Sequence, residues 1–310
     1  MPHNSLLSRI QSWIRVPDRS AGGRTPAPFI VGAGRSGTTL LRLMLDAHPE
    51  LAIPPETHFI HGVVKVCEGE SDPRAAFIET LVTHRRWGDF QVEHGELGKR
   101  VASISPFNVG DGLRAFYALY AERFAKVKWG DKTPAYIQRM RLVHGVLPEA
   151  RFIHLIRDGR DVALSAKDLW FGPNSIEEAA EHWRSIIDDA RKQAPHLPYY
   201  IEVRYEDLVS DPETTLRKIC RFIHLKWDPV MLAYHEKAEK RLSEIYRDLT
   251  DRGGTGGVRG EDRKAIHALA VKPPQIERIG RWRREMPAAD RERFERIAGA
   301  TLRELHYEIG

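Results

Sequence analysis

Cysteine is scarce in this chain of 310 residues, which contains only Cys67 and Cys220, far apart in sequence. They form neither a CxxC pair nor a metal-ligand spacing, and so small a number is typical of a protein from a reducing compartment. No apolar run approaches the roughly 18 residues of a membrane span, and the N-terminus lacks the apolar core of a secretory signal. We therefore expect a cytoplasmic protein without a transmembrane segment.

Metal-binding motifs are also absent, because the 14 histidines are scattered and neither an HExxH nor an EF-hand pattern occurs. We expect no metal cofactor. Internal repeats are missing too, which favours one folded domain. The net charge of +5 is small, so it does not choose between small anionic ligands and nucleic acid as partners.

The chain divides into a short N-terminal segment and one domain. Residues 6–16 form a basic amphipathic stretch that could lie on an anionic membrane surface or pack against the domain. Residues 19–28 are rich in Gly, Pro and Arg, as is typical of a linker. These features predict an N-terminal amphipathic segment and linker over 1–27 and a folded domain over 28–310.

Apolar, strand-like runs and helical patterns alternate along this domain. Strands are expected at residues 29–32, 151–156 and 199–203, and helices at 113–127, 175–193, 212–223 and 288–305. This alternation predicts an α/β fold, a single P-loop-like domain with a central parallel sheet flanked by helices. Residues 251–262 contain five glycines and few apolar residues, which favours a mobile loop, either a plain connector or a lid over the site.

A glycine-rich turn follows the first expected strand at Gly32–Thr39, GAGRSGTT. Its backbone N–H groups and the hydroxyls of Ser36, Thr38 and Thr39 stand at a helix N-terminus, where the helix dipole favours an anion. Arg35 could fork onto phosphate or sulfate oxygens. A plain strand-to-helix turn is the structural alternative. Because Thr38 stands where an ordinary P-loop has its lysine, the turn differs from that of a kinase.

A second polar group follows the expected strand that ends at Ile156. Arg157 should lie at the carboxyl edge of the sheet, where open α/β folds bind their ligands, and Ser165 faces the same way if the next segment is helical. A surface network of arginine and aspartate that caps a helix explains the same spacing equally well.

Together the two segments resemble the donor-binding motifs of the sulfotransferases that use 3′-phosphoadenosine-5′-phosphosulfate (PAPS), most closely the tyrosylprotein and related bacterial branch. The resemblance implies that the first motif cradles the 5′ end of PAPS through Arg35, Ser36, Gly37, Thr38 and Thr39. It implies that Arg157 and Ser165 bind the 3′-phosphate. It extends through Trp129–Pro134, Val203–Leu208, Val271–Pro273 and Gly280–Trp282, whereas residues 61–126 match nothing in the family pattern.

The resemblance also assigns catalytic roles. Glu56, in the sequence PPETHF at the start of an expected helix, aligns with the catalytic base of the tyrosylprotein branch, and His58 is the reserve base. Lys132 matches the lysine near the leaving oxygen, which Arg35 also serves, and Tyr205 and Lys272 resemble contacts to the nucleotide. Each has a structural alternative: Glu56 could stabilise a helix N-terminus, and Lys132 and Lys272 could be solvated surface charges.

The sequence thus favours an enzyme that moves a sulfuryl group from PAPS to a hydroxyl by in-line displacement and releases adenosine 3′,5′-bisphosphate (PAP). A glycan, a glycolipid or a small molecule is the favoured acceptor, with protein tyrosine as a further candidate. A P-loop phosphotransferase that uses ATP and Mg²⁺ and a catalytically silent nucleotide-binding protein are the alternatives. A nucleic-acid partner is not expected.

Overall fold

The computed structural model describes residues 24–167, 169–170, 172–250 and 257–310. The strands are β1 (Ala27–Val31), β2 (Leu51–Ala52), β3 (Lys128–Trp129), β4 (Asp131–Lys132), β5 (Ala150–Ile156), β6 (Tyr200–Arg204), β7 (Leu249–Thr250) and β8 (Gly257–Val258). The α-helices are α1 (Thr38–Asp46), α2 (Ile60–Cys67), α3 (Arg74–Val82), α4 (Trp87–Phe90), α5 (His94–Ala102), α6 (Val109–Glu122), α7 (Met140–Val146), α8 (Gly159–Ala166), α9 (Ile176–Gln193), α10 (Tyr205–Ser210), α11 (Pro212–Phe222), α12 (His235–Leu242), α13 (Gly260–His267), α14 (Trp282–Glu285) and α15 (Ala288–Glu304). Short 3₁₀ turns are η3 (Pro134–Arg139), η4 (Ala194–His196), η5 (Pro229–Ala233), η6 (Ser243–Ile245) and η7 (Ile276–Arg278).

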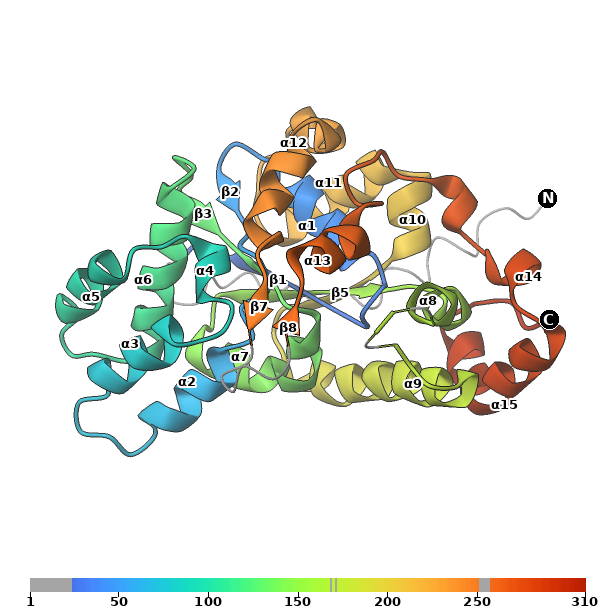
Figure 1. Cartoon of the computed structure of the whole chain (residues 1–310), viewed down its shortest axis with the longest axis horizontal. Coiled ribbons are helices and arrows are strands. Elements are labelled where there is room, and N and C mark those ends of the chain that lie inside the picture. The colour runs from blue at the N-terminus through green and yellow to red at the C-terminus, as the bar shows by residue number, and fades with distance from the viewer. Residues whose placement is uncertain (1–23, 168, 171, 251–256) are drawn as a thin grey trace.

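A central sheet has the strand order β4-β1-β5-β6, and each neighbouring pair is parallel. In β1, Ile30 is paired with Ile153 of β5 on one side and with Lys132 of β4 on the other. The three longer strands lie within two residues of the predicted runs. This confirms the predicted α/β fold with a central parallel sheet (Figure 1).

Each face of the sheet has its own apolar core, because successive side chains of a strand point to opposite faces. Phe29 of β1 and Phe152 of β5 belong to the core under α6, α9 and α15, which also contains Trp183. Ile30 and its neighbours on β5 and β6 belong to the core under α1, α11 and α12. Figure 1 shows α9 and α15 on one side of β5, and α1, α10 and α11 on the other.

Three of the helices predicted from periodicity, α6, α9 and α11, begin at a residue whose side chain caps the helix. The Ser175 side chain accepts a hydrogen bond from the Glu178 N–H at 3.1 Å and so begins α9. Asp211 caps α11, whose first residue is Pro212. The helix expected at 113–127 is α6, which begins earlier, at Val109 after its cap Asn108. The segment after β5 forms α8, Gly159–Ala166, so Ser165 lies on a helix, as its predicted placing requires.

The expectations for residues 6–16 and 251–262 meet different outcomes. The amphipathic stretch 6–16 lies outside the described residues, so the N-terminal division stays a prediction. The loop expected over 251–262 is wrong beyond residue 256, because β8 pairs antiparallel with β7 and α13 begins at Gly260. A Cβ on Gly260 would lie 1.9 Å from the Tyr246 carbonyl oxygen, so this glycine allows close backbone packing.

None of the helices in the described ranges is both long and apolar enough to span a membrane.

The segment 61–126 forms helices α2 to α6, which lie beside one end of the sheet (Figure 1). Its centre is Phe116, which is fully buried. The Phe116 ring centroid lies 5.1 Å from those of Phe59 and Phe90 and 5.2 Å from that of Tyr117. Edge-to-face pairs of this kind add to the free energy gained by burial. The aromatic side chains of α6, Phe116 and Tyr117, are therefore part of the apolar core.

Replacement of Phe116 by alanine should lower the free energy of unfolding by about 3–5 kcal/mol, because it removes a buried ring from this cluster. Urea denaturation followed by circular dichroism measures the change. The matched control is Val127→Ala, since Val127 is 80% exposed and its truncation should change the free energy by less than about 0.5 kcal/mol. Equal effects of the two changes would show that the cluster is not a core.

Candidate active site

The glycine-rich turn between β1 and α1 has a shape that only glycine permits at two positions. At Gly32 a Cβ would lie 2.5 Å from the Leu155 carbonyl oxygen of the neighbouring strand β5. At Gly37, where φ is +93°, a Cβ would lie 2.4 Å from Cδ2 of Tyr205. The turn therefore lies directly against β5 and the start of α10, at the carboxyl edge of the sheet, where open α/β folds bind ligands.

One hydroxyl of this turn is buried without a hydrogen-bond partner among the described residues. Ser36 is 1% exposed, and its Oγ has no hydrogen-bond partner within the described part of the chain. Thr38 is also buried and begins α1, whose free N–H groups and dipole favour an anion. A buried hydroxyl without a partner is costly, so the turn fits a bound phosphate or sulfate group.

The two predicted donor-binding motifs meet at Arg35. Its Nε donates to Oγ of Ser165 on α8 at 3.3 Å, and its carbonyl oxygen accepts from Nη1 of Arg157 at 3.3 Å. The guanidinium of Arg157 lies 4.4 Å from the centroid of the Tyr205 ring, and its Nε is buried without a partner among the described residues. The two motifs therefore form one continuous group of side chains that contains two arginines, Arg35 and Arg157.

A small cavity of about 100 Å³ opens between these residues. Of the predicted nucleotide-binding residues, it brings together Arg35, Gly37, Thr38, Thr39, Arg157, Ser165, Tyr205 and Lys272. Ser36 is buried within the same turn and does not line the cavity. We call this the donor cavity.

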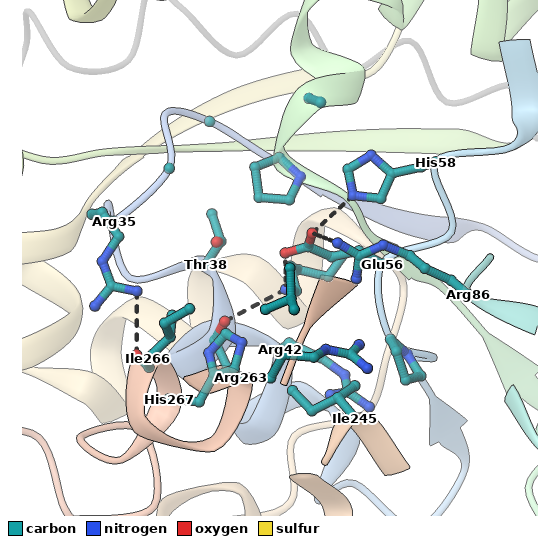
Figure 2. A pocket seen from close by; sticks show the side chains of 18 of the residues that line it. Arg35, Thr38, Arg42, Glu56, His58, Arg86, Ile245, Arg263, Ile266 and His267 are labelled. Carbon is teal, nitrogen blue, oxygen red and sulfur yellow. Dashed lines mark hydrogen bonds and ion pairs between the residues drawn. The ribbon is translucent and has the colours of Figure 1, made fainter. Parts of the chain in front are cut away.

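A larger cavity of about 400 Å³ adjoins it and contains the predicted catalytic residues (Figure 2). Lys132 Nζ lies 2.7 Å from Oε1 of Glu56 and 3.4 Å from Oγ1 of Thr39. The other Glu56 oxygen, Oε2, lies 2.9 Å from Nε2 of His58 and 3.7 Å from Nη2 of Arg86. We call this the acceptor cavity.

The sequence predicts Glu56 at the start of a helix. This prediction is wrong, because α2 starts only at Ile60. The loop is held instead by the next residue, Thr57. The Thr57 N–H donates to Oγ1 of Thr133 at 2.9 Å, and its hydroxyl donates to Oδ2 of Asp131 at 2.8 Å. Asp131 and Thr133 flank Lys132 in sequence. The segment 131–133 therefore fixes the loop that carries Glu56 and also supplies its cation.

The charges around Glu56 determine its protonation. Burial alone would raise the pKa of Glu56, but Lys132, His58 and Arg86 outweigh burial and hold this pKa well below its usual range. Burial lowers the pKa of Lys132, and the Glu56 carboxylate opposes that shift. Because its pKa is depressed, Glu56 is ionised at neutral pH.

Several residues that line the two cavities were not predicted from the sequence. Ile266 and His267 of α13 line both cavities, together with Arg35, Thr38 and Thr39. Their segment contains no motif and adjoins the glycine-rich stretch that was expected to be a loop, so the sequence carried no signal for them. Arg86 comes from the region that matched nothing, and Arg42 lies on the helix after the turn.

Comparison with known proteins identifies the class. The model of the sulfotransferase family matches residues 26–229. Protein-tyrosine sulfotransferase 1 of Danio rerio is 25% identical over 296 residues, which are 91% of this chain and 72% of that protein. Nodulation protein NoeE of Sinorhizobium fredii is 27% identical over 305 residues, covering 90% of this chain and 65% of that protein.

Two solved sulfotransferase domains have the same fold as this chain. The sulfotransferase domain from the Synechococcus PCC 7002 olefin synthase is 25% identical, with a TM-score of 0.59, over 96% of this chain and 99% of that one. The sulfotransferase domain from the curacin biosynthetic pathway has the same fold, with a TM-score of 0.55, 19% identity and coverage of 93% and 99%. The chain belongs to the sulfotransferase family, so the family, the fold and the enzyme class predicted from the sequence are confirmed.

Replacement of Gly37 by alanine should weaken PAP binding at least tenfold, because the Cβ meets Tyr205 and φ there is unfavourable for L residues. Isothermal titration calorimetry with PAP measures the change. The matched control is Gly95→Ala in α5, where a Cβ meets nothing within 4 Å. Wild-type affinity in Gly37→Ala would contradict the close packing of the turn against Tyr205.

Proposed function

We propose that this enzyme transfers the sulfuryl group of PAPS to a hydroxyl acceptor by in-line displacement. The observation that carries the proposal is the ion pair of Glu56 and Lys132, a base and a cation 2.7 Å apart beside Thr39, which lines both cavities. The oxygen–sulfur bond to the 5′-phosphate breaks and the acceptor oxygen–sulfur bond forms. The acceptor proton passes to Glu56, and PAP leaves.

The donor cavity suits both ends of the nucleotide. The turn with its unpartnered Ser36 hydroxyl would hold the 5′-phosphosulfate, and Arg157 with Ser165 would hold the 3′-phosphate. Tyr205 and Lys272 line the same cavity and would contact the nucleotide. Arg35 belongs to the first motif and contacts Ser165 and Arg157 of the second, so its guanidinium lies near both proposed phosphate positions.

Lys132 has two tasks in this mechanism. It pairs with Glu56 in the ligand-free protein, and it would neutralise the charge that develops on the leaving oxygen, together with Arg35. When the donor draws Lys132 away, Glu56 loses the cation that lowers its pKa most. Its pKa then rises, which makes it a better base in the presence of the donor. His58, the reserve base, contacts Glu56 Oε2 and would orient the carboxylate.

The acceptor cavity supports a small molecule or a sugar unit as the acceptor. Its volume of about 400 Å³ lies within the range of small-molecule sites. Apolar side chains form much of its wall, among them Ile137, Ile186, Leu242 and Ile245. Trp170, which is 66% exposed, also lines it and offers an aromatic surface to a ring. Protein tyrosine remains the alternative, as the tyrosine sulfotransferase relatives suggest.

Replacement of Glu56 by glutamine should lower kcat by about 10²-fold or more, because the amide cannot accept the acceptor proton. PAP affinity should be retained. The measurement is PAP release from PAPS with 4-nitrophenol and a panel of sugars as acceptor probes. The exposed Glu79→Gln variant is the matched control. An active Glu56→Gln variant would show that Glu56 is not the base. A wild-type protein that binds PAP but turns over none of the acceptors would favour a silent nucleotide-binding protein.

Replacement of Arg157 by alanine should weaken PAP binding by about 10- to 100-fold, since it removes charge-assisted hydrogen bonds to a phosphate. Calorimetry with PAP measures this, and the exposed Arg221→Ala variant serves as the control. If Arg157→Ala is folded and binds PAP as the wild type does, the 3′-phosphate lies elsewhere.

A further inference from the structure

Helix α13 lies where the two cavities adjoin, and contacts at both ends hold it there. Near its start, Arg263 donates to both carboxylate oxygens of Asp89 in α4, at 3.0 and 2.5 Å. Near its end, the Ile266 carbonyl oxygen accepts from Nη1 of Arg35 at 3.2 Å. The residue after Ile266 is therefore held against the phosphate-binding turn.

That residue is His267, which lines both the donor and the acceptor cavity (Figure 2). Its ring has no hydrogen-bond partner within the described ranges, although it is surrounded by charged groups. The groups that act on it are Lys132 and Glu56 at the acceptor side, Arg35 of the turn and Arg42 of α1. A polar ring without a partner, at the boundary of two ligand cavities, is available to a ligand.

Its surroundings fix the protonation state of this ring. Burial and the cations Lys132, Arg35 and Arg42 lower the pKa of His267 to about 3, against the opposing effect of Glu56. The imidazole is therefore neutral at neutral pH, with one nitrogen that donates and one that accepts. So low a pKa makes it a poor proton acceptor, which leaves hydrogen-bond donation as its chemistry.

We propose that His267 donates a hydrogen bond to an oxygen of the transferring sulfuryl group. This rests on the proposed sulfotransferase function, in which the sulfur atom passes from the donor cavity to the acceptor cavity and so crosses their boundary. The sulfuryl oxygens carry negative charge throughout the transfer, and a fixed neutral N–H donor there stabilises it. His267 is then a catalytic residue that the sequence motifs do not reveal.

The test compares PAP with PAPS, because only PAPS carries the sulfuryl group. Calorimetry without acceptor gives the Kd of each ligand for wild type, His267→Ala and His267→Gln. We expect PAP affinity to stay within about twofold in both variants. PAPS affinity should fall about tenfold or more in His267→Ala and recover in large part in His267→Gln, whose amide is a neutral donor. The control is His196→Ala, an exposed histidine in η4.

Three outcomes would overturn the proposal. Unchanged PAPS affinity in folded His267→Ala would show that the ring does not contact the sulfuryl group. Equal losses for PAP and PAPS in both variants would show that the ring only packs α13. A large loss of turnover at an unchanged PAPS to PAP affinity ratio, with altered pH dependence, would assign proton transfer to it. Absence of PAP binding by the wild type would instead contradict the proposed function itself.

Discussion

The ion pair of Glu56 and Lys132 is the interaction on which the proposed chemistry depends. Its two members come from a loop and from the two-residue strand β4, and neither element is stable alone. Parallel pairing of β4 with β1 places Lys132 beside the phosphate-binding turn. Hydrogen bonds of Thr57 to Asp131 and Thr133 place Glu56 against it. One short strand thus carries Lys132, the proposed leaving-group cation, and also positions Glu56, the proposed base.

This arrangement gives two adjoining cavities, the donor cavity and the acceptor cavity, that share part of their lining. Arg157 and Tyr205 lie on the donor side, whereas Glu56 and Arg86 lie on the acceptor side. The turn after β1 borders both cavities. The segment 61–126, which matched no motif, supplies Arg86 to the acceptor cavity from the turn between α3 and α4.

The sequence predicted what local pattern and spacing determine. Buried strands are continuous apolar runs, and their carboxyl edge can be inferred once they are parallel, so the gathering of Arg35, Arg157 and Ser165 followed from their positions. Features that depend on tertiary contacts could not be predicted from the sequence. Strand β4 is too short to show periodicity, and Glu56 is held by Thr57 instead of by a helix start. Gly260 suggested flexibility, although it serves close packing.

The most direct measurement of the central claim is calorimetric binding of PAP against ATP to the wild-type protein, without Mg²⁺ and then with it. The account predicts tight PAP binding that does not depend on the metal, and much weaker binding of ATP, because the site pairs a 5′-phosphate turn with a separate 3′-phosphate site at Arg157 and Ser165. A preference for ATP that requires Mg²⁺ would contradict it and favour phosphoryl transfer.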